Sequence, residues 1–449
     1  MRPSQDVKSV FERELDVRAK LHRSGKGGVR VSIALAQRLD RLINFIFTDL
    51  AMPQKRALAV VGLGGYGRYE LCFASDTDVM FLVSSEKEKA EAVEVAKEFI
   101  HRLFDNGLTV GHSFRSIQEC LEFQNSDVEI WTSLLESRFI CGNQRVFRSL
   151  HSGMQKAVDR TNKALFVKSL LTLSTARHEK FGASTKLLEP NVKVSAGGLR
   201  DLHTVLWLVR GTGTLRLPQK GSQPAVVQLL NSRVIQRLLP SGFTKQPQRS
   251  FDFLLRVRNE MHRESKSLHD TLDFLFQPQV AEGLGYRPTK RRSRVEHFMQ
   301  DYYVTARAIN LLYQRVLAWV TDRFLDTTET QKVHRLDDSF VQRGNRLAFR
   351  TKRARLTNVD ALRAFLHSAN LKVPLSLELE DSLYRSLNSF RPLHTPMEAE
   401  LFRQLLKSGR VAEAFRRINE LGLLARWIPE WAPMVAYFQH NVYHYYTVD

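Results

Sequence analysis

The residues of this chain that could do chemistry gather in one short stretch, between positions 60 and 83. Gly64, Gly65 and Gly67 predict a loop that approaches an anion, because glycine adopts positive φ and successive N–H groups can then face phosphate oxygens. Asp76 and Asp78 follow at the start of an apolar run, and residues two apart on a strand point to the same face. Two such carboxylates can hold Mg²⁺, which keeps open positions for phosphate oxygens and water. The stretch therefore predicts a site for a nucleoside triphosphate and a metal ion.

Two other interpretations of this stretch stay open. Gly62, Gly64 and Gly67 have the spacing of a dinucleotide-binding loop. That fold needs a sustained amphipathic helix directly after the loop, whereas only about two helical turns separate Arg68 from Ser75. Alternatively, the glycines form a plain turn and the aspartates cap a strand. Two acids beside a buried strand are costly to desolvate without a cation, which favours the metal site.

The glycines and aspartates belong to two longer motifs, Gly-Gly-x-Gly-Arg-x-Glu-Leu at 64–71 and Ser-Asp-x-Asp at 75–78. Together they resemble the core of the DNA polymerase beta-type nucleotidyltransferases. Within that superfamily the chain is similar to the bacterial PII uridylyltransferase/uridylyl-removing enzyme family. Further motifs in that family's order extend along the chain, at 189–193, 197–207, 270–286, 298–303 and 439–449.

The resemblance implies roles for the first two motifs. The two aspartates would bind Mg²⁺ and bring a hydroxyl in line with the α-phosphorus of the triphosphate, so that pyrophosphate leaves. Ser75 and the three glycines would contact the nucleotide. Arg68 could reach a phosphate, or it could form an internal ion pair with Glu70.

The general base is not identified by these motifs. A third carboxylate on a neighbouring strand is the usual companion of the aspartate pair in this superfamily. The strand expected at 108–114 offers His112 and no acid. His112 is a candidate base or ligand, although a lone histidine on a strand can equally be a satisfied core residue.

A second polar cluster surrounds the Gly-Gly pair at 197–198. Lys193, Arg200 and Asp201 suit a loop that folds over the nucleotide. Alternatively, Arg200 and Asp201 tie two helices together and the glycines form a turn. Arg256, Arg258 and His262, on one predicted helix, are interpreted as solvated or interhelical residues.

The family resemblance implies a function that motif chemistry alone does not reach. It implies transfer of UMP from UTP to a tyrosine of a PII signalling protein, whereas the motifs alone support Mg²⁺-dependent transfer of a nucleotidyl group. Adenylylation of another protein, a non-catalytic nucleotide-sensing or interaction module, and an RNA-directed transferase are the alternatives. Because the metal-binding residues of the family's HD hydrolase domain lie beyond Asp449, we expect the uridylyl-removing activity to be absent, as well as the glutamine-sensing ACT domains.

Composition restricts the setting. Lys and Arg exceed Asp and Glu to give a formal net charge of +20, but this surplus is scattered and accompanies no nucleic-acid motif, so we do not expect nucleic acid as a partner. The three cysteines have no metal-site spacing and are expected to be reduced thiols. No apolar run approaches the ~20 residues that span a bilayer, and no signal peptide is recognised. We expect a cytoplasmic protein without membrane contact.

The pattern along the chain predicts an α+β fold, with a small mixed-sheet nucleotidyltransferase core followed by mostly helical domains. Strands are expected at 58–61, 79–83 and 108–114, a helix at 86–104, and a hairpin that turns at Gly344-Asn345. Glycine and proline clusters at 182, 190–198 and 211–224 predict breaks between helices. The expected division is a helical lead-in (1–57), the core (58–150), a helical uridylyltransferase-associated domain (151–328), a linker region with hairpin and helices (329–432) and the truncated start of an HD domain (433–449).

Overall fold

The computed structural model describes residues 27–106, 108, 110–217, 223–240, 242–290, 292–325, 333–351, 355–437 and 446–447. The chain divides into two compact units. The first contains the residues up to Thr185 with Glu189–Ile235 and Pro247–Asn310, and the second contains Lys186–Leu188, Gln236–Gln246 and the residues from Leu311 onward. Both units combine helices with a sheet, so the α+β class predicted from the sequence is confirmed.

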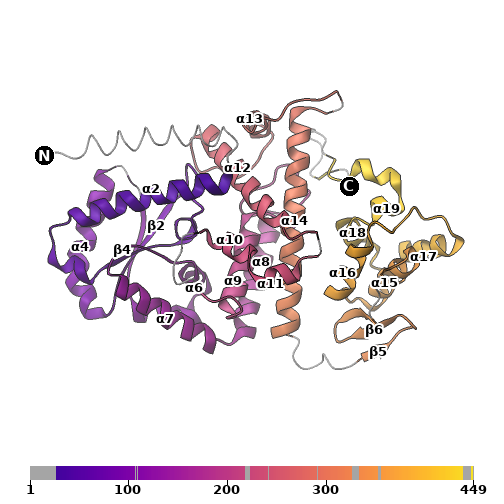
Figure 1. Cartoon of the computed structure of the whole chain (residues 1–449), viewed down its shortest axis with the longest axis horizontal. Helices are drawn as coiled ribbons and strands as arrows, with labels where there is room; N and C mark the ends of the chain where they lie inside the picture. The colour runs from indigo at the N-terminus through magenta and orange to yellow at the C-terminus, as the bar shows by residue number, and fades with distance from the viewer. Residues whose placement is uncertain are drawn as a thin grey trace. The chain divides into compact units, whose positions relative to one another are not determined.

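The first unit is built on a four-stranded mixed sheet (Figure 1). Its strands are β1 (Ala59–Gly62), β2 (Thr77–Val83), β3 (Val110–Ser116) and β4 (Arg138–Gly142), in the spatial order β3-β2-β1-β4. β2 pairs antiparallel with β1 and parallel with β3, while β4 pairs antiparallel with the other side of β1. The three predicted strands are confirmed, with ends shifted by one or two residues.

β4 is a strand that the sequence did not predict, because the pattern after residue 127 is mostly helical. The strand has five residues and begins with a charged one. Nothing local distinguishes so short a segment from a loop between helices. Its pairing with β1, about 80 positions earlier in the chain, is what makes it a strand.

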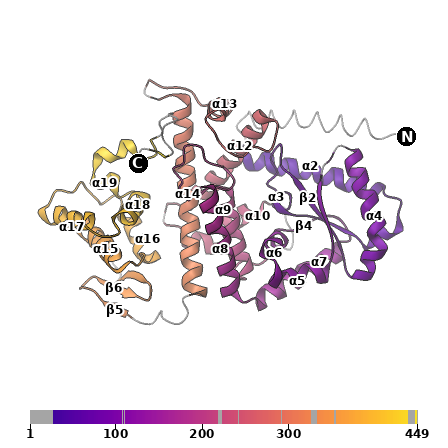
Figure 2. The same cartoon turned by 180° about the vertical axis from the view of Figure 1, so that it is seen from behind.

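Helices cover both faces of this sheet. Leu39, Phe81 and Phe99 are buried in one core on the face covered by α2 and α4, whereas α5 and α7 lie on the other face, where the thiol of Cys120 meets Met80. Figure 2 shows α2 and α7 on opposite sides of the strands. The helices of the sheet region are α2 (Gly28–Asp49), η1 (Pro53–Ala57), α3 (Gly64–Gly67), α4 (Glu86–Asp105), α5 (Ile117–Ser126), α6 (Val128–Leu135) and α7 (Gln144–Arg160).

Helix α2 confirms the apolar spacing seen in the sequence, since Leu35, Leu39, Ile43 and Ile46 are all buried. The part of the lead-in helix expected before residue 27 lies outside the described residues. Helix α4 confirms the helix predicted at 86–104.

A layer of helices follows the sheet in the chain. The predicted breaks are confirmed: α8 ends before Gly182, which has φ of 101°, α9 begins directly after Gly198, and α10 begins directly after Pro224. Helix α9 is buried along nearly its whole length. The bounds are α8 (Lys163–Phe181), α9 (Leu199–Gly211), α10 (Ala225–Leu230), α11 (Arg233–Leu238), α12 (Gln246–Ser265), α13 (Phe276–Gly283) and α14 (Arg294–Phe324).

The second unit contains a three-stranded antiparallel sheet and a helical bundle. The predicted hairpin is confirmed, with Gly344 at φ of 57° in its turn, and β5 adds a strand that was not predicted. Phe340, Phe365 and Trp427 are buried in its core. The bounds are β5 (Val333–Arg335), β6 (Phe340–Arg343), β7 (Arg346–Phe349), α15 (Asn358–Leu371), α16 (Leu377–Ser386), α17 (Pro396–Leu406), α18 (Val411–Leu421), α19 (Leu424–Trp427) and η2 (Pro429–Met434).

Most of the expected HD lead-in lies outside the described residues, including Tyr443 and His444. The five-part division therefore stays a prediction. Among the described residues, no helix is both long and apolar enough to cross a membrane.

Gly67 provides a test of the packing beneath the glycine motif. A Cβ at this position would lie 2.7 Å from the carbonyl oxygen of Gly62 and 2.8 Å from that of Glu136, both of them backbone atoms. We therefore expect Gly67→Ala to lower the free energy of unfolding by about 1–3 kcal/mol, measured by urea denaturation. Gly65→Ala is the control, because its Cβ would meet nothing closer than 3.9 Å. Equal stability of the two variants would contradict this packing.

Candidate functional site

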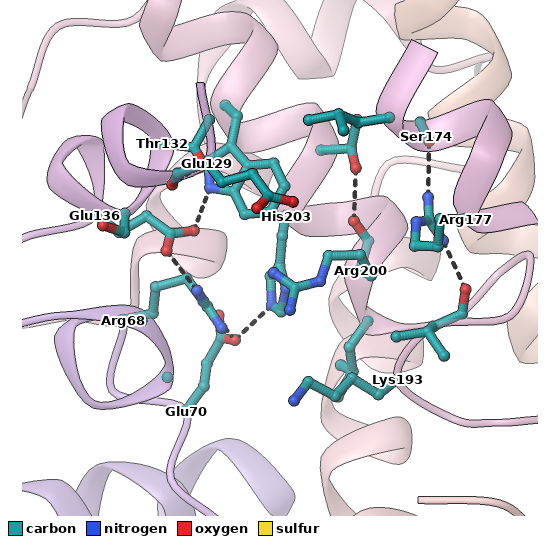
Figure 3. A pocket seen from close by; sticks show the side chains of 18 of the residues that line it. Arg68, Glu70, Glu129, Thr132, Glu136, Ser174, Arg177, Lys193, Arg200 and His203 are labelled. Carbon is teal, nitrogen blue, oxygen red and sulfur yellow. Dashed lines mark hydrogen bonds and ion pairs between the residues drawn. The ribbon is translucent and has the colours of Figure 1, made fainter. Parts of the chain in front are cut away.

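A cavity of about 480 Å³ lies in the first unit, which is within the usual range for small-molecule sites. Helices α6, α8 and α9 form much of its wall (Figure 3). Residues of α3, of α12, of the start of β2 and of the segments before β2 and before α9 also line it. Eight of the site residues predicted from the sequence line it: Gly64, Gly65, Arg68, Ser75, Asp76, Asp78, Lys193 and Arg200. The fold thus brings the two motif clusters, over 100 positions apart, into one site.

The two aspartates come from the start of β2, an inner strand of the sheet. Asp76 directly precedes the strand and Asp78 lies on it, and both side chains are exposed to the cavity. Partial burial of Asp78 and the nearby negative charge of Asp76 raise the pKa of Asp78. The positive charge of Lys193 opposes this shift. This like-charge pair is an arrangement that a cation would stabilise.

Glycines keep the space around Asp78 open. A Cβ at Gly111, the β3 partner of Asp78, would lie 2.6 Å from Asp78 Oδ1, and a Cβ at Gly64 would lie 3.1 Å from Asp78 Oδ2. Any larger residue at either position would press on the carboxylate. The described residues contain no cluster of three or more His, Cys, Asp or Glu side chains that could hold a metal ion. The aspartate pair with this free space is therefore the cavity's acidic centre.

The glycine motif forms one turn of helix, α3, in place of the open loop predicted from the sequence. The N–H of Gly67 donates to the carbonyl of Leu63 at 2.8 Å, and Gly67 does not line the cavity. Gly67 is closely packed in this structure, and its phosphate contact stays a prediction. Gly64 and Gly65 do line the cavity.

Arg68 is the centre of a buried ion network. Its Nε lies 2.8 Å from Glu70 Oε2 and its Nη1 lies 2.5 Å from Glu136 Oε2, and the residue is 5 % exposed. Of the two possibilities left open by the sequence, the structure thus shows the internal ion pair with Glu70. Tyr69, at φ of 62°, makes the sharp backbone turn between the two partners.

Two residues of α9 extend this network. His203 Nε2 lies 2.6 Å from Glu70 Oε2 (Figure 3). The indole N–H of Trp207 donates to Glu136. Burial raises the pKa of Glu70, but Arg68 and His203 outweigh it and hold that pKa at about 2. Burial and the charge of Arg68 lower the pKa of His203 to about 3, so the ring is neutral and Nε2–H donates. The network therefore fastens α9 to the sheet domain.

Asp201 does not line the cavity, although the sequence made it a candidate for nucleotide binding. Its buried carboxylate accepts hydrogen bonds from Arg177 at 2.6 Å and from the N–H of Gly197 at 2.7 Å, and it contacts His178 at 2.9 Å. This is the helix-tying role weighed as the alternative. Arg177 also donates to the carbonyl of Val194 at 2.7 Å, so the pair shapes the loop that carries Lys193.

Lys193 and Arg200 are the cavity's cations without an ion pair in the part of the chain that the structure describes. The other cavity arginines are each paired with a carboxylate. Burial lowers the pKa of Lys193, and burial together with Arg68 lowers that of Arg200 to about 10. A buried cation repelled by its neighbours gains most from an anionic ligand. These two side chains are therefore suited to phosphate.

His112 lies away from this centre. It pairs in register with Val79 on β2, whereas Gly111 pairs with Asp78, so His112 points to the opposite face of the sheet from the aspartates. It is exposed and does not line the cavity. The structure thus gives no support to a catalytic role for His112.

Several cavity residues were not predicted as site residues from the sequence. Glu136, His203 and Trp207 form the network around Arg68, and Glu129 and Thr132 line the wall from α6. Arg258, interpreted from the sequence as solvated or interhelical, is 7 % exposed and lines the cavity. His203 and Trp207 fall within the 197–207 motif, which was the one available signal.

Two family models match the chain. The model described as GlnD PII-uridylyltransferase matches residues 165–317. The model described as Glutamate-ammonia ligase adenylyltransferase, GlnE, matches residues 29–109. The matches support a nucleotidyltransferase of the GlnD/GlnE family. The matches do not distinguish GlnD from GlnE, because each model covers one half of the site. The GlnD match contains Lys193 and Arg200, and the GlnE match contains Asp76 and Asp78.

The Arg68 network yields a stability prediction. Arg68→Met leaves two buried carboxylates without their cation, so we expect the free energy of unfolding to fall by about 3–5 kcal/mol in urea denaturation at neutral pH. Burial would then raise the pKa values of Glu70 and Glu136 above those in the unfolded chain. A raised native pKa means stability lost as pH rises, so the deficit should be smaller near about pH 5 than near about pH 8.

Arg102→Met is the matched control, because Arg102 pairs with Glu98 at 2.8 Å on the surface. Removal of such an exposed pair costs about 0–1 kcal/mol. A similar, pH-independent loss in both variants would contradict the buried network.

Proposed function

We propose that the chain is a Mg²⁺-dependent uridylyltransferase, which moves UMP from UTP to a tyrosine hydroxyl of a PII-type signalling protein and releases pyrophosphate. One observation carries the proposal. The same cavity contains the aspartate pair and, on the helical layer, Lys193 and Arg200, which have no carboxylate partner among the residues that the structure describes. A site with acidic and basic halves suits a metal-bound triphosphate.

Asp76 and Asp78 fit Mg²⁺. Mg²⁺ is commonly held by one or two carboxylates together with water and substrate phosphates, and the glycines beside Asp78 leave space for these further ligands. When bound, the ion neutralises phosphate charge and orients the attacking and leaving oxygens. The chain's own contribution is to hold both carboxylates side by side at the cavity wall.

Lys193 and Arg200 would bind the phosphates that leave as pyrophosphate. Their positive charges compensate the charge that develops on the leaving group, which makes them electrostatic contributors to the transition state. Gly64 and Gly65 allow the backbone of α3 to approach the same phosphates without a side chain in between.

The donor and acceptor are the finer part of the proposal. The uridylyltransferase family model matches 165–317, which includes the α8, α9 and α12 residues of the cavity wall. On that wall Leu173 and Phe181 are 39 % and 40 % exposed, and such an apolar surface suits the ring of an acceptor tyrosine. The match at 29–109 favours a second candidate, adenylylation of another protein.

The testing experiment is incubation with Mg²⁺, one nucleoside triphosphate at a time and one acceptor, either a PII protein or glutamine synthetase (glutamate-ammonia ligase), followed by intact-mass analysis of the acceptor. We expect a uridylyl-sized mass increase with UTP only. An adenylyl-sized increase on glutamine synthetase but none on PII would favour the second candidate. Triphosphate binding without transfer to either protein would indicate a nucleotide-sensing module.

The aspartates provide the first mutational test. We expect Asp76→Asn and Asp78→Asn each to reduce transfer to the background, because each removes a metal-binding charge at constant volume. The melting temperature should stay equal or rise, because the repulsion that raises the pKa of Asp78 is relieved. Transfer at the wild-type rate in either variant would overturn the metal assignment.

The cations provide the second test. Lys193→Met and Arg200→Met should each raise the KM for the triphosphate by about 10-fold or more, the value of a lost charge-assisted hydrogen bond. Lys168→Met is the matched control, since Lys168 is exposed on α8 and does not line the cavity. Initial rates at varied triphosphate concentration measure the effect. Unchanged KM values in both cavity variants would refute phosphate binding by these side chains.

A further inference from the structure

A tight turn at 72–75 directly precedes the acidic pair. The N–H of Cys72 donates to Ser75 Oγ at 2.8 Å, and the N–H of Ser75 donates to the carbonyl of Cys72 at 3.0 Å. Ser75 and Asp76 both line the cavity. The orientation of this turn therefore determines where the first aspartate enters the site.

Helix α12 holds the turn from outside the sheet domain. The N–H of Ala74 donates to His262 Nδ1 at 3.2 Å, and Arg258 Nη1 lies 3.9 Å from Cys72 Sγ. His262 is 2 % exposed, so water does not compete for this hydrogen bond. The contact joins positions 188 residues apart in sequence.

Asp270 fixes the state of the histidine. His262 Nε2 lies 3.0 Å from Asp270 Oδ1, and Arg258 contacts both oxygens of the same carboxylate at 2.7 and 3.1 Å. A neutral imidazole has one donor and one acceptor nitrogen. Because Nδ1 accepts from Ala74, Nε2 must carry the hydrogen and donate to Asp270. Burial lowers the pKa of His262, which keeps the ring in this neutral form.

We propose that His262 is a positioning residue for nucleotidyl transfer, which sets the 72–75 turn and thereby the placement of Asp76 in the cavity. The inference rests on the function proposed above and extends it to a residue that touches neither triphosphate nor metal. It also makes α12 one of the elements that determine the position of Asp76. Residues that orient metal-binding side chains typically change activity by about 10- to 100-fold when removed.

Two amide substitutions separate positioning from bulk packing. The side-chain oxygen of Asn takes the place of Nδ1 and can accept the Ala74 N–H, whereas the amide of Gln takes the place of Nε2 and can reach only Asp270. We expect His262→Gln to lower kcat by about 10- to 100-fold with KM for the triphosphate changed by less than about threefold. His262→Asn should recover most of the lost kcat.

Hydrogen–deuterium exchange of the peptide that contains Ala74 gives a readout independent of activity. We expect its amide to exchange on the order of tenfold faster in His262→Gln than in the wild type, because one hydrogen bond is lost, and to remain protected in His262→Asn. His367→Gln is the matched control. His367 forms an equivalent bond to Asp337, at 2.9 Å, in the second unit, and its loss should alter neither kcat nor Ala74 exchange.

Equal losses of kcat in His262→Asn and His262→Gln, or unchanged Ala74 exchange in His262→Gln, would overturn the positioning role. Failure of the proposed function has a different signature. In that case the wild-type protein itself shows no transfer, while the exchange comparison between the two variants still decides whether His262 holds the turn.

Discussion

The buried guanidinium of Arg68 is the interaction on which the rest of the cavity depends. It is shared by Glu70 and Glu136, and these carboxylates also accept hydrogen bonds from His203 and Trp207 of α9. Burial of this many charges costs desolvation energy, so such a network contributes little net stability. Its consequence is geometric. Because α9 is fastened to the sheet domain, the cations carried by and before α9 face the aspartates carried by β2.

The cavity separates charges that hold the fold from charges available for a ligand. Three of its arginines are satisfied by carboxylates, at Glu70 and Glu136, at Asp201, and at Asp270. In the described part of the chain, Lys193 and Arg200 have no such partner. The paired arginines determine the shape of the site, and the unpaired cations determine which ligand it favours. This distinction supports a nucleotidyltransferase more specifically than net charge does.

Local signals in the sequence were sufficient for much of this site. The strand at 79–83, the glycine breaks and the Asp76–Asp78 pair depend on residues within a few positions of one another, and they were predicted. Glu136 and β4 could not be predicted, because their roles arise from partners about 70 to 80 positions away. The position of His112 depends on strand register, which the sequence does not give. The sequence left open whether Asp201 contacts the nucleotide or ties two helices together. Its contact with Arg177, 24 positions away, is not visible in the local pattern.

The central claim is that one cavity binds a metal-complexed triphosphate between its acidic and basic walls. Isothermal titration of the protein with a non-hydrolysable UTP analogue, with Mg²⁺ and then with a chelator, tests it most directly. The account predicts saturable binding at one site that weakens strongly when Mg²⁺ is withdrawn, because the aspartates then repel the phosphates. Binding of equal strength without Mg²⁺, or no saturable binding, would contradict it.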